Sequence, residues 1–180
     1  MNHLLSKSEL RKVFAQKRNH LSPQRRKNAS ESLKKTFIPH LETFSNVLSF
    51  ASMAHEINLT DLNIYLCKKK KLFLPRICEN NLWIYQVDEL KDLKKSSLSF
   101  LEPDPNKCRL VELNEISSIL VPGLVFDKHC NRLGYGKGHY DRLLSQIEAP
   151  CFGIGFFEQL SATPLPQEEH DKPLYKLYLF

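Results

Sequence analysis

The stretch VPGLVFDKHCNRLGYGKGHYDRLL, residues 121–144, holds four of the six glycines in a chain of 180 residues. It begins in an apolar run, continues through a loop and the turn Gly134-x-Gly136-x-Gly138, and ends in a predicted helix over 139–144. Such clustering marks backbone that approaches a ligand closely or takes positive φ. A glycine turn that opens a helix directs unpaired N–H groups at one point, so the segment favours a phosphate site.

Two common nucleotide motifs do not fit this turn. No Gly-Lys-Ser/Thr closes it as in a Walker A loop, and His139 stands where the dinucleotide fingerprint has its last glycine. The bare glycine pattern is therefore a weak indicator. Arg132 and Lys137 strengthen it, because both can neutralise a polyphosphate. Asp141 follows in the predicted helix, where it can hold a divalent cation on that phosphate.

Apolar runs and helical patterns alternate along the rest of the chain. Strands are predicted at 47–52, 72–75, 82–87, 119–122 and 151–156. Helices are predicted at 6–20, where Leu10, Val13 and Phe14 follow helical spacing, from Ser22 to Pro39, and from a Thr60 cap to the lysines at 68–71. This order predicts one α/β domain over 1–180, a three-layer sandwich around a mostly parallel sheet, with basic N-terminal helices.

Positive charge is concentrated at the N-terminus. The net charge of the chain is +6, and residues 1–36 contain ten Lys or Arg against two acids, so this segment alone carries +8. Three interpretations compete: contact with nucleic acid, a basic wall beside an anionic small ligand, and solvated faces of two surface helices.

Composition excludes several classes of protein. Hydrophobic residues make up 42% and charged residues 26%, which is a globular balance. No apolar stretch is long enough to span a bilayer, and no signal-peptide core is visible before Lys7 and Glu9. The five cysteines form no CxxC pair, which disfavours a disulfide framework or a zinc ribbon. We therefore expect a cytoplasmic protein with no membrane partner, and a monomer.

The glycine-rich stretch resembles the signature of the 5-formyltetrahydrofolate cyclo-ligase family, which is close to VPGLxFDxxGxRLGxGxGYYDR. The chain matches that signature at Pro122, Gly123, Phe126, Asp127, Arg132, Leu133, Gly134, Gly136, Gly138, Tyr140, Asp141 and Arg142. Other features of the family follow in order, namely Lys7 with Leu10-Arg11, Ser52-Met53 before Glu56 and Thr60, Leu74-Pro75, Glu102-Pro103, Gly153-x-Gly155-Phe156 with Gln159, and His170-Asp171.

Three positions depart from the family pattern. Cys130 stands where glycine is usual, and His139 replaces an aromatic residue before Tyr140. Tyr135 occupies a variable position that is often Arg or Met. We expect His139 to alter how the substrate packs, and the other two to adjust a loop.

The resemblance implies an enzyme that closes 5-formyltetrahydrofolate, with or without a polyglutamate tail, to 5,10-methenyltetrahydrofolate. Magnesium-bound ATP would be the co-substrate, with ADP and phosphate released. Phosphorylation of the formyl oxygen would make it a good leaving group, and N10 would then attack the formyl carbon. Catalysis would depend mainly on positioning and on charge neutralisation.

Site residues follow from the same resemblance. Lys137 and Arg132 would be catalytic, and Asp141 and Asp171 would hold magnesium. The residues assigned to folate are Ala51, Glu56, Tyr135, His139 and Tyr140, with the Glu56 carboxylate accepting N–H groups of the pterin. The residues assigned to ATP are Lys7, Arg11, Arg132, Leu133, Gly134, Tyr135, Gly136, Lys137, Gly138, His139 and Tyr140.

Two rival functions remain at this stage. A small basic RNA-binding protein would use residues 1–36, but Phe14 is the one aromatic side chain there for base stacking. A different ATP-dependent enzyme could share the glycine turn, although the folate-side residues argue against it. We favour the cyclo-ligase and expect no nucleic-acid partner.

Overall fold

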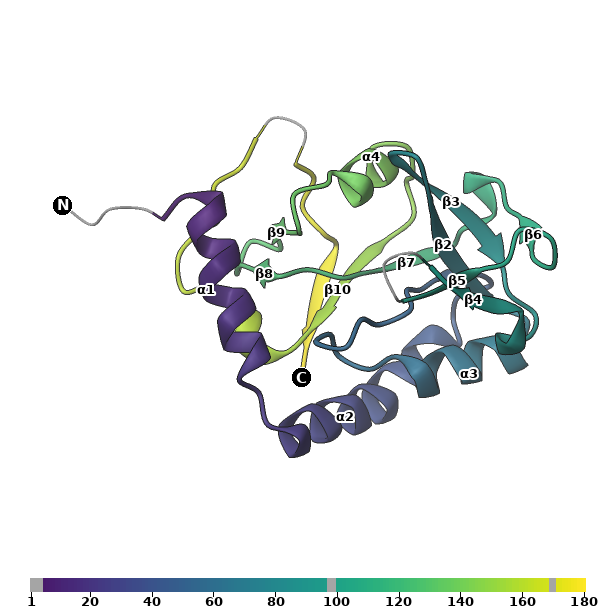
Figure 1. Ribbon diagram of the computed structural model, residues 1–180, viewed down its shortest axis with the longest axis horizontal. Helices are drawn as coiled ribbons and strands as arrows, with labels where there is room; N and C mark the ends of the chain where they lie inside the picture. Colours follow the sequence, from purple (N-terminus) through teal and green to yellow (C-terminus); the bar gives the residue numbers. More distant parts are fainter. Residues whose placement is uncertain (1–4, 97–99, 169–170) are drawn as a thin grey trace.

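The computed structural model describes residues 5–96, 100–168 and 171–180 (Figure 1). Within them lies a seven-stranded sheet of order β11-β10-β7-β1-β2-β3-β6. Pairings from β11 through β2 are parallel, whereas β3 pairs antiparallel with both β2 and β6. The mostly parallel α/β sheet is therefore confirmed. Its strands are β1 (Val47–Leu48), β2 (Leu72–Cys78), β3 (Asn81–Gln86), β6 (Arg109–Leu110), β7 (Ser118–Val121), β10 (Cys151–Gly155) and β11 (Lys176–Leu179).

Both faces of the sheet are buried. Successive side chains of its central strands point to opposite sides, and each set packs into a different hydrophobic core. Val47 and Leu120 join one core with helices α2 (Pro23–Leu41) and α3 (Thr60–Lys68). Leu48 and Ile119 join a second core with α4 (His139–Leu144). The sheet thus lies between two layers, with α2 and α3 on one side and α4 on the other (Figure 1).

Helix α1 (Lys7–Asn19) stands at one side of the sheet, next to the hairpin of β8 (Val125–Phe126) and β9 (Arg132–Leu133). Its start is the predicted capping box, in which the Ser6 and Glu9 side chains bond each other's backbone N–H groups. Leu10 and Phe14 are buried against the hairpin. The helix is thereby fixed to the strand pair that carries the glycine turn. The remaining elements are β4 (Leu93–Lys95), β5 (Leu101–Pro103) and 3₁₀ turns at Leu90–Asp92, Leu113–Glu115 and Phe157–Gln159.

Some predicted boundaries are wrong. Helix α2 continues past Pro39 to Leu41, although proline has no N–H for the helical hydrogen bond at that position. Strand β1 stops at Leu48, since the Phe50 carbonyl bonds the Asn63 side chain instead of a neighbouring strand. Leu59, not Thr60, is the N-cap of α3. Val13, which follows the same helical spacing as Leu10 and Phe14, is exposed.

The strand order reverses direction between β1 and β7. From β1 the chain proceeds through α3 to β2 on one side, and from β7 it proceeds to β10 on the other. In open parallel sheets such a switch leaves a crevice beyond the carboxyl ends of the two strands, and ligands bind there. The fold therefore points to the segments that follow Leu48 and Val121.

The signature residue Asp127 holds this part of the fold together. Its fully buried carboxylate accepts hydrogen bonds from the backbone N–H groups of His129, Asn131 and Leu165 at 2.9, 3.0 and 2.8 Å, and from the Asn131 amide at 3.0 Å. Burial alone would raise the pKa of Asp127, but these donors outweigh it and hold the pKa below its ordinary value.

We predict that Asp127→Ala lowers the free energy of unfolding by about 3 kcal/mol, because each buried donor left unpaired costs roughly 1–3 kcal/mol. Since the folded pKa is depressed, this stabilisation is present above the ordinary pKa of about 3.9 and is lost as the pH falls through the folded value. Urea unfolding at pH 7 and near pH 3 measures both effects. Asp88, whose carboxylate is exposed and pairs with Lys70 at 3.5 Å, is the control, and Asp88→Ala should cost under about 1 kcal/mol. Equal losses in the two variants would contradict the assignment.

Candidate functional site

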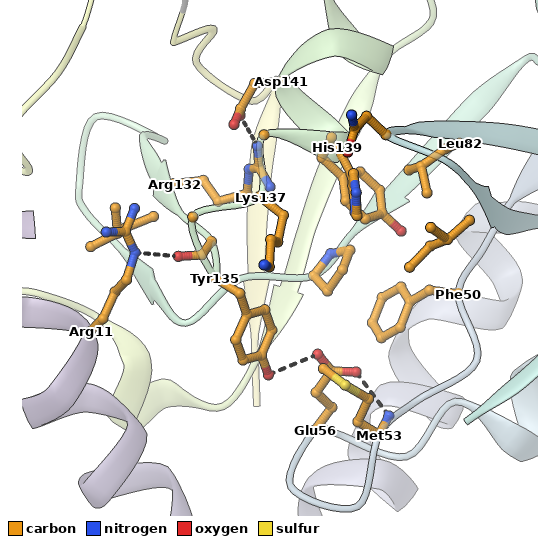
Figure 2. A pocket seen from close by; sticks show the side chains of 18 of the residues that line it. Arg11, Phe50, Met53, Glu56, Leu82, Arg132, Tyr135, Lys137, His139 and Asp141 are labelled. Carbon is orange, nitrogen blue, oxygen red and sulfur yellow. Dashed lines mark hydrogen bonds and ion pairs between the residues drawn. The ribbon is translucent and has the colours of Figure 1, made fainter. Parts of the chain in front are cut away.

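A cavity of about 690 Å³ lies at the predicted crevice (Figure 2). Its walls come from α1, from the segment after β1, from the β2–β3 turn, and from the chain between β9 and α4. All the residues that the sequence assigned to the site line this one cavity: Lys7, Arg11, Ala51, Glu56, Arg132, Leu133, Gly134, Tyr135, Gly136, Lys137, Gly138, His139, Tyr140, Asp141 and Asp171. His170, which the sequence matched together with Asp171, lies outside the described residues.

The turn over 134–138 needs its glycines for two reasons. Gly136 and Gly138 have φ of +86° and +67°, in the left-handed region that favours glycine. In addition, a Cβ at Gly136 would lie 3.2 Å from the Arg11 guanidinium. Because α4 has only six residues, its dipole is small, and the affinity of the turn for phosphate would depend on its N–H groups and the surrounding cations.

Two arginines of α1 hold the turn from outside. The Arg11 Nε donates to the Gly134 carbonyl at 2.9 Å, and an Arg18 Nη donates to the Tyr135 hydroxyl at 2.5 Å. Lys7, Arg11 and Arg18 follow one stripe of the helix, at spacings of four and seven residues. Lys7 and Arg11 therefore line one cavity, and Arg18 reaches the turn beside it.

Arg132 lies under the turn in a nearly dry environment. Its side chain is 6% exposed, forms an ion pair with Asp141 and lies 5.6 Å from the centre of the Tyr140 ring. Burial lowers the pKa of Arg132, while Asp141 opposes that shift. Within the described part of the chain, its Nε is buried without a hydrogen-bond partner. Arg132 thus brings a largely buried positive charge to the cavity wall, and the Asp141 carboxylate holds it in place.

Lys137 and His139 differ from Arg132 in their setting. Lys137 is exposed, and Figure 2 shows its side chain extending across the cavity from the turn. The pKa of His139 is lowered, first by burial and then by the positive charges of Arg142 and Lys137. The lowered pKa favours a neutral imidazole, which adds uncharged surface to the cavity beside the exposed cation of Lys137.

Lys7 forms a second charged corner of the cavity. Its ammonium lies 2.8 Å from Asp171 and 2.9 Å from Glu168. Burial by itself would lower the pKa of Lys7, but the two carboxylates raise it above its ordinary value. Among residues 5–96, 100–168 and 171–180, no group of three or more His, Cys, Asp or Glu side chains is arranged to hold a metal ion.

Glu56 lies across the cavity from the glycine turn. It is 9% exposed, and its carboxylate accepts the Met53 backbone N–H at 2.9 Å and the Tyr135 hydroxyl at 3.3 Å (Figure 2). Burial raises the pKa of Glu56, and the Met53 donor and the Arg18 charge counteract part of that shift. A carboxylate that is buried but still faces a cavity is suited to accept N–H donors from a ligand.

Sequence reasoning missed the apolar wall and Arg18. The wall consists of Phe50, Met53, Ile77, Leu82 and Phe100, which add apolar surface to the cavity that Glu56 also lines. Their types match ordinary core residues, so no spacing distinguished them. Arg18 was one of many basic residues in a basic segment, and its burial follows only from how α1 packs.

The Cys130 substitution has a clear structural setting. Cys130 takes φ of +63°, in the left-handed region, which explains why glycine suits this position. Its backbone N–H bonds the Asp127 carbonyl and its carbonyl accepts the Leu174 N–H, so the loop is tied at both groups. The departure changes local strain at a position outside the cavity lining.

Comparisons with known proteins agree with this geometry. The model of the 5-formyltetrahydrofolate cyclo-ligase family matches residues 4–178. The mouse 5-formyltetrahydrofolate cyclo-ligase is 29% identical over 92% of this chain and 89% of its own length. The solved structure of Aquifex aeolicus 5,10-methenyltetrahydrofolate synthetase aligns with a TM-score of 0.85 at 31% identity, covering 96% of this chain and 89% of that one.

A second solved structure, a 5,10-methenyltetrahydrofolate synthetase from Mycoplasma pneumoniae, aligns with a TM-score of 0.77 at 20% identity over 96% of this chain and 98% of that one, and shows the shared fold. Among the described residues, no helix has the length and apolar character needed to cross a membrane. The family match spans nearly the whole chain and includes the glycine turn, Glu56, Asp141 and Asp171. The chain therefore belongs to the 5-formyltetrahydrofolate cyclo-ligase family and is a ligase.

Proposed function

We propose that this enzyme converts 5-formyltetrahydrofolate to 5,10-methenyltetrahydrofolate with ATP, releasing ADP and phosphate. One observation carries the proposal: a single cavity joins a cation-flanked glycine turn to a buried carboxylate beside an apolar wall. The turn suits a triphosphate, and the carboxylate and wall suit a pterin, which is a flat ring with paired N–H donors. At about 690 Å³ the cavity lies within the usual range of ligand pockets, roughly 300–1,000 Å³.

The reaction needs activation of a poor leaving group. The γ-phosphoryl group of ATP passes to the formyl oxygen, and ADP leaves. N10 then attacks the formyl carbon, the C–O bond breaks, phosphate departs with the oxygen, and N10 gives up its proton. Both steps redistribute negative charge on phosphoryl oxygens, so fixed cations around the turn lower the barrier.

Three groups take the phosphates in this proposal. Backbone N–H groups of 134–138 form the cradle, the Arg132 guanidinium contributes its positive charge from below, and Lys137 reaches across from the turn. Arg11 lies beside Gly136, where a Cβ would touch its guanidinium, and completes the positive wall. Leu133 and Tyr140, which also line the cavity, would make further contacts with the bound ATP.

Asp141 and Asp171 fit a magnesium ion that arrives with ATP. Mg²⁺ is commonly held by one or two carboxylates together with substrate phosphates and water, which agrees with two acids at the phosphate end of the cavity. Bound there, the ion would neutralise charge on the transferring phosphoryl group. Both acids are now paired with cations of the chain, Arg132 and Lys7, so each is held ready at the site.

The RNA-binding alternative is disfavoured by where the basic side chains go. Lys7 and Arg11 line the cavity, and Arg18 is buried against Tyr135. Arg25 pairs with a carboxylate of its own chain at 2.7 Å, and Arg26 donates to three backbone carbonyls. Half of the ten basic residues of this segment are therefore committed to the cavity or to the fold.

The reaction itself is the first test. We expect incubation with 5-formyltetrahydrofolate, ATP and magnesium to produce the absorbance of methenyltetrahydrofolate. The product should not form when ATP is omitted. Absence of ATP-dependent product at high enzyme concentration would reject the proposed function.

Glu56→Gln should weaken folate binding about 10- to 100-fold and change ATP affinity by less than about twofold, because charge-assisted hydrogen bonds contribute roughly 1.5–3 kcal/mol. Calorimetric titration of each ligand measures this, with Glu42→Gln as control, since Glu42 accepts a tyrosine hydroxyl far from the cavity lining. Because burial raises the pKa of Glu56, with Arg18 and Tyr135 opposing, wild-type folate affinity should begin to fall at a higher pH than an exposed glutamate would give. Equal loss of affinity for both ligands would show that Glu56 has a structural role instead.

Arg11→Ala and Lys7→Ala should each raise the KM for ATP about tenfold, since each removes a charge-assisted contact near the phosphates. Lys12→Ala is the matched control, because Lys12 is the exposed neighbour of Arg11 on α1 and does not line the cavity. Gel-shift experiments on the intact protein should show no tight RNA complex at physiological salt. An unchanged KM together with salt-resistant RNA binding would favour the alternative.

Lys137→Ala should lower kcat by roughly 10²–10³ while leaving the KM for ATP nearly unchanged, because a cation on the transferring phosphoryl group acts mainly in the transition state. Lys137→Arg should recover part of the rate by keeping the charge. Lys128→Ala, at an exposed loop position outside the cavity lining, should behave as wild type. A kcat of Lys137→Ala within about twofold of wild type would move this role to Arg132 or to the metal.

A further inference from the structure

A chain of hydrogen bonds crosses the cavity from α1 to the segment after β1. An Arg18 Nη donates to the Tyr135 hydroxyl at 2.5 Å, and that hydroxyl donates to the Glu56 carboxylate at 3.3 Å. The three residues come from α1, the glycine turn and the β1–α3 segment (Figure 2 shows the Tyr135–Glu56 part). The chain thus links the proposed phosphate cradle to the proposed pterin ligand.

Arg18 is the fixed end of this chain. It is 4% exposed, and its guanidinium carbon lies 5.6 Å from the centre of the Tyr135 ring. Within the described part of the chain, its Nε and Nη1 are buried without a hydrogen-bond partner. Burying a cation with so few partners is unfavourable, so Arg18 is not explained as a stabilising residue of the fold. It contacts Tyr135 and adds positive charge near Glu56.

Tyr135 is the middle member of this chain. It lies between Gly134 and Gly136, so the backbone on both sides of it has the conformational freedom of glycine. The residue is 46% exposed although its hydroxyl points inward, and its bond to Glu56 is at the long end of hydrogen-bond geometry. Small changes in the turn therefore decide how firmly the hydroxyl holds the carboxylate.

We propose that Tyr135, positioned by Arg18, couples nucleotide binding to folate binding, so that each ligand raises the affinity for the other. The inference rests on the proposed function. Phosphates that bind the N–H groups of 134–138 fix the turn, the fixed turn holds the Tyr135 hydroxyl more firmly against Glu56, and the carboxylate is then oriented before the pterin arrives. By linkage, bound folate strengthens nucleotide binding by the same factor. Arg18 is a positioning residue, because it acts through Tyr135.

The experiment is a coupling measurement. Calorimetry gives the Kd of 5-formyltetrahydrofolate with and without a saturating, non-hydrolysable ATP analogue and magnesium, and the ratio of the two values is the coupling factor. We expect a wild-type factor of about tenfold, within the usual range for coupled sites. Because the factor is a ratio within one protein, any loss of affinity for folate alone cancels.

Tyr135→Phe should reduce the factor to within about twofold of one, since the hydroxyl is removed and the ring is kept. Tyr65→Phe is the matched control: the Tyr65 hydroxyl also donates to a glutamate, Glu42, at 2.9 Å, but outside the cavity lining, and its factor should equal that of wild type. Arg18→Met should give the same loss as Tyr135→Phe, and the double variant should lose no more than either single one.

The outcomes separate the two claims. A wild-type factor near one, or a factor in Tyr135→Phe equal to that of wild type, overturns the coupling while the cyclo-ligase activity stands. Failure of wild-type protein to bind either ligand overturns the proposed function and the coupling with it. If Arg18→Met does not fold, Tyr135→Phe and its Tyr65→Phe control still decide.

Discussion

A turn made largely of glycine cannot fix its own position, and the rest of the site depends on how this constraint is met. Gly134, Gly136 and Gly138 leave room for a ligand, but they supply no side chain to anchor the backbone. The anchors come from α1, through Arg11 on the Gly134 carbonyl and Arg18 on the Tyr135 hydroxyl. Helix α1 is in turn fixed by apolar burial against the β8–β9 hairpin that carries the turn. The N-terminal helix is thus part of the site.

Charge compensation is the second principle of the cavity. Each acid that the proposed reaction needs is already paired with a cation: Asp141 with Arg132, and Asp171 with Lys7. Glu56 has the nearby charge of Arg18 and hydrogen bonds that counteract the effect of burial on its pKa. Preformed pairs lower the cost of burying charge before ligands arrive. In the proposed reaction the carboxylates and cations are therefore already in place before a triphosphate arrives, which is the preorganisation that phosphoryl transfer needs.

The sequence predicted what depends on local pattern. Helix α4 was predicted to the residue, and β7 and β10 within one residue at each end, because long apolar runs and a glycine turn define them. Strands such as β8 and β9 have two residues each, too short for any periodicity, and were not predicted. The residues that the motif assigned to the site line one cavity, whereas the Tyr135–Glu56 contact joins positions 79 residues apart and follows only from the fold. Arg18 could not be told apart from the solvated basic residues around it.

A signature of this kind combines two sorts of residue that the sequence alone does not separate. Lys137 faces the cavity, whereas Asp127 is fully buried and satisfied by backbone N–H groups. Gln159 is likewise structural: its amide donates to the Gly123 carbonyl at 2.7 Å and accepts the Phe156 N–H at 2.8 Å. These buried side chains tie β10 and the β8–β9 hairpin together behind the turn. Because a preorganised site is only as well placed as its support, the residues that never touch a ligand are as constrained as those that do.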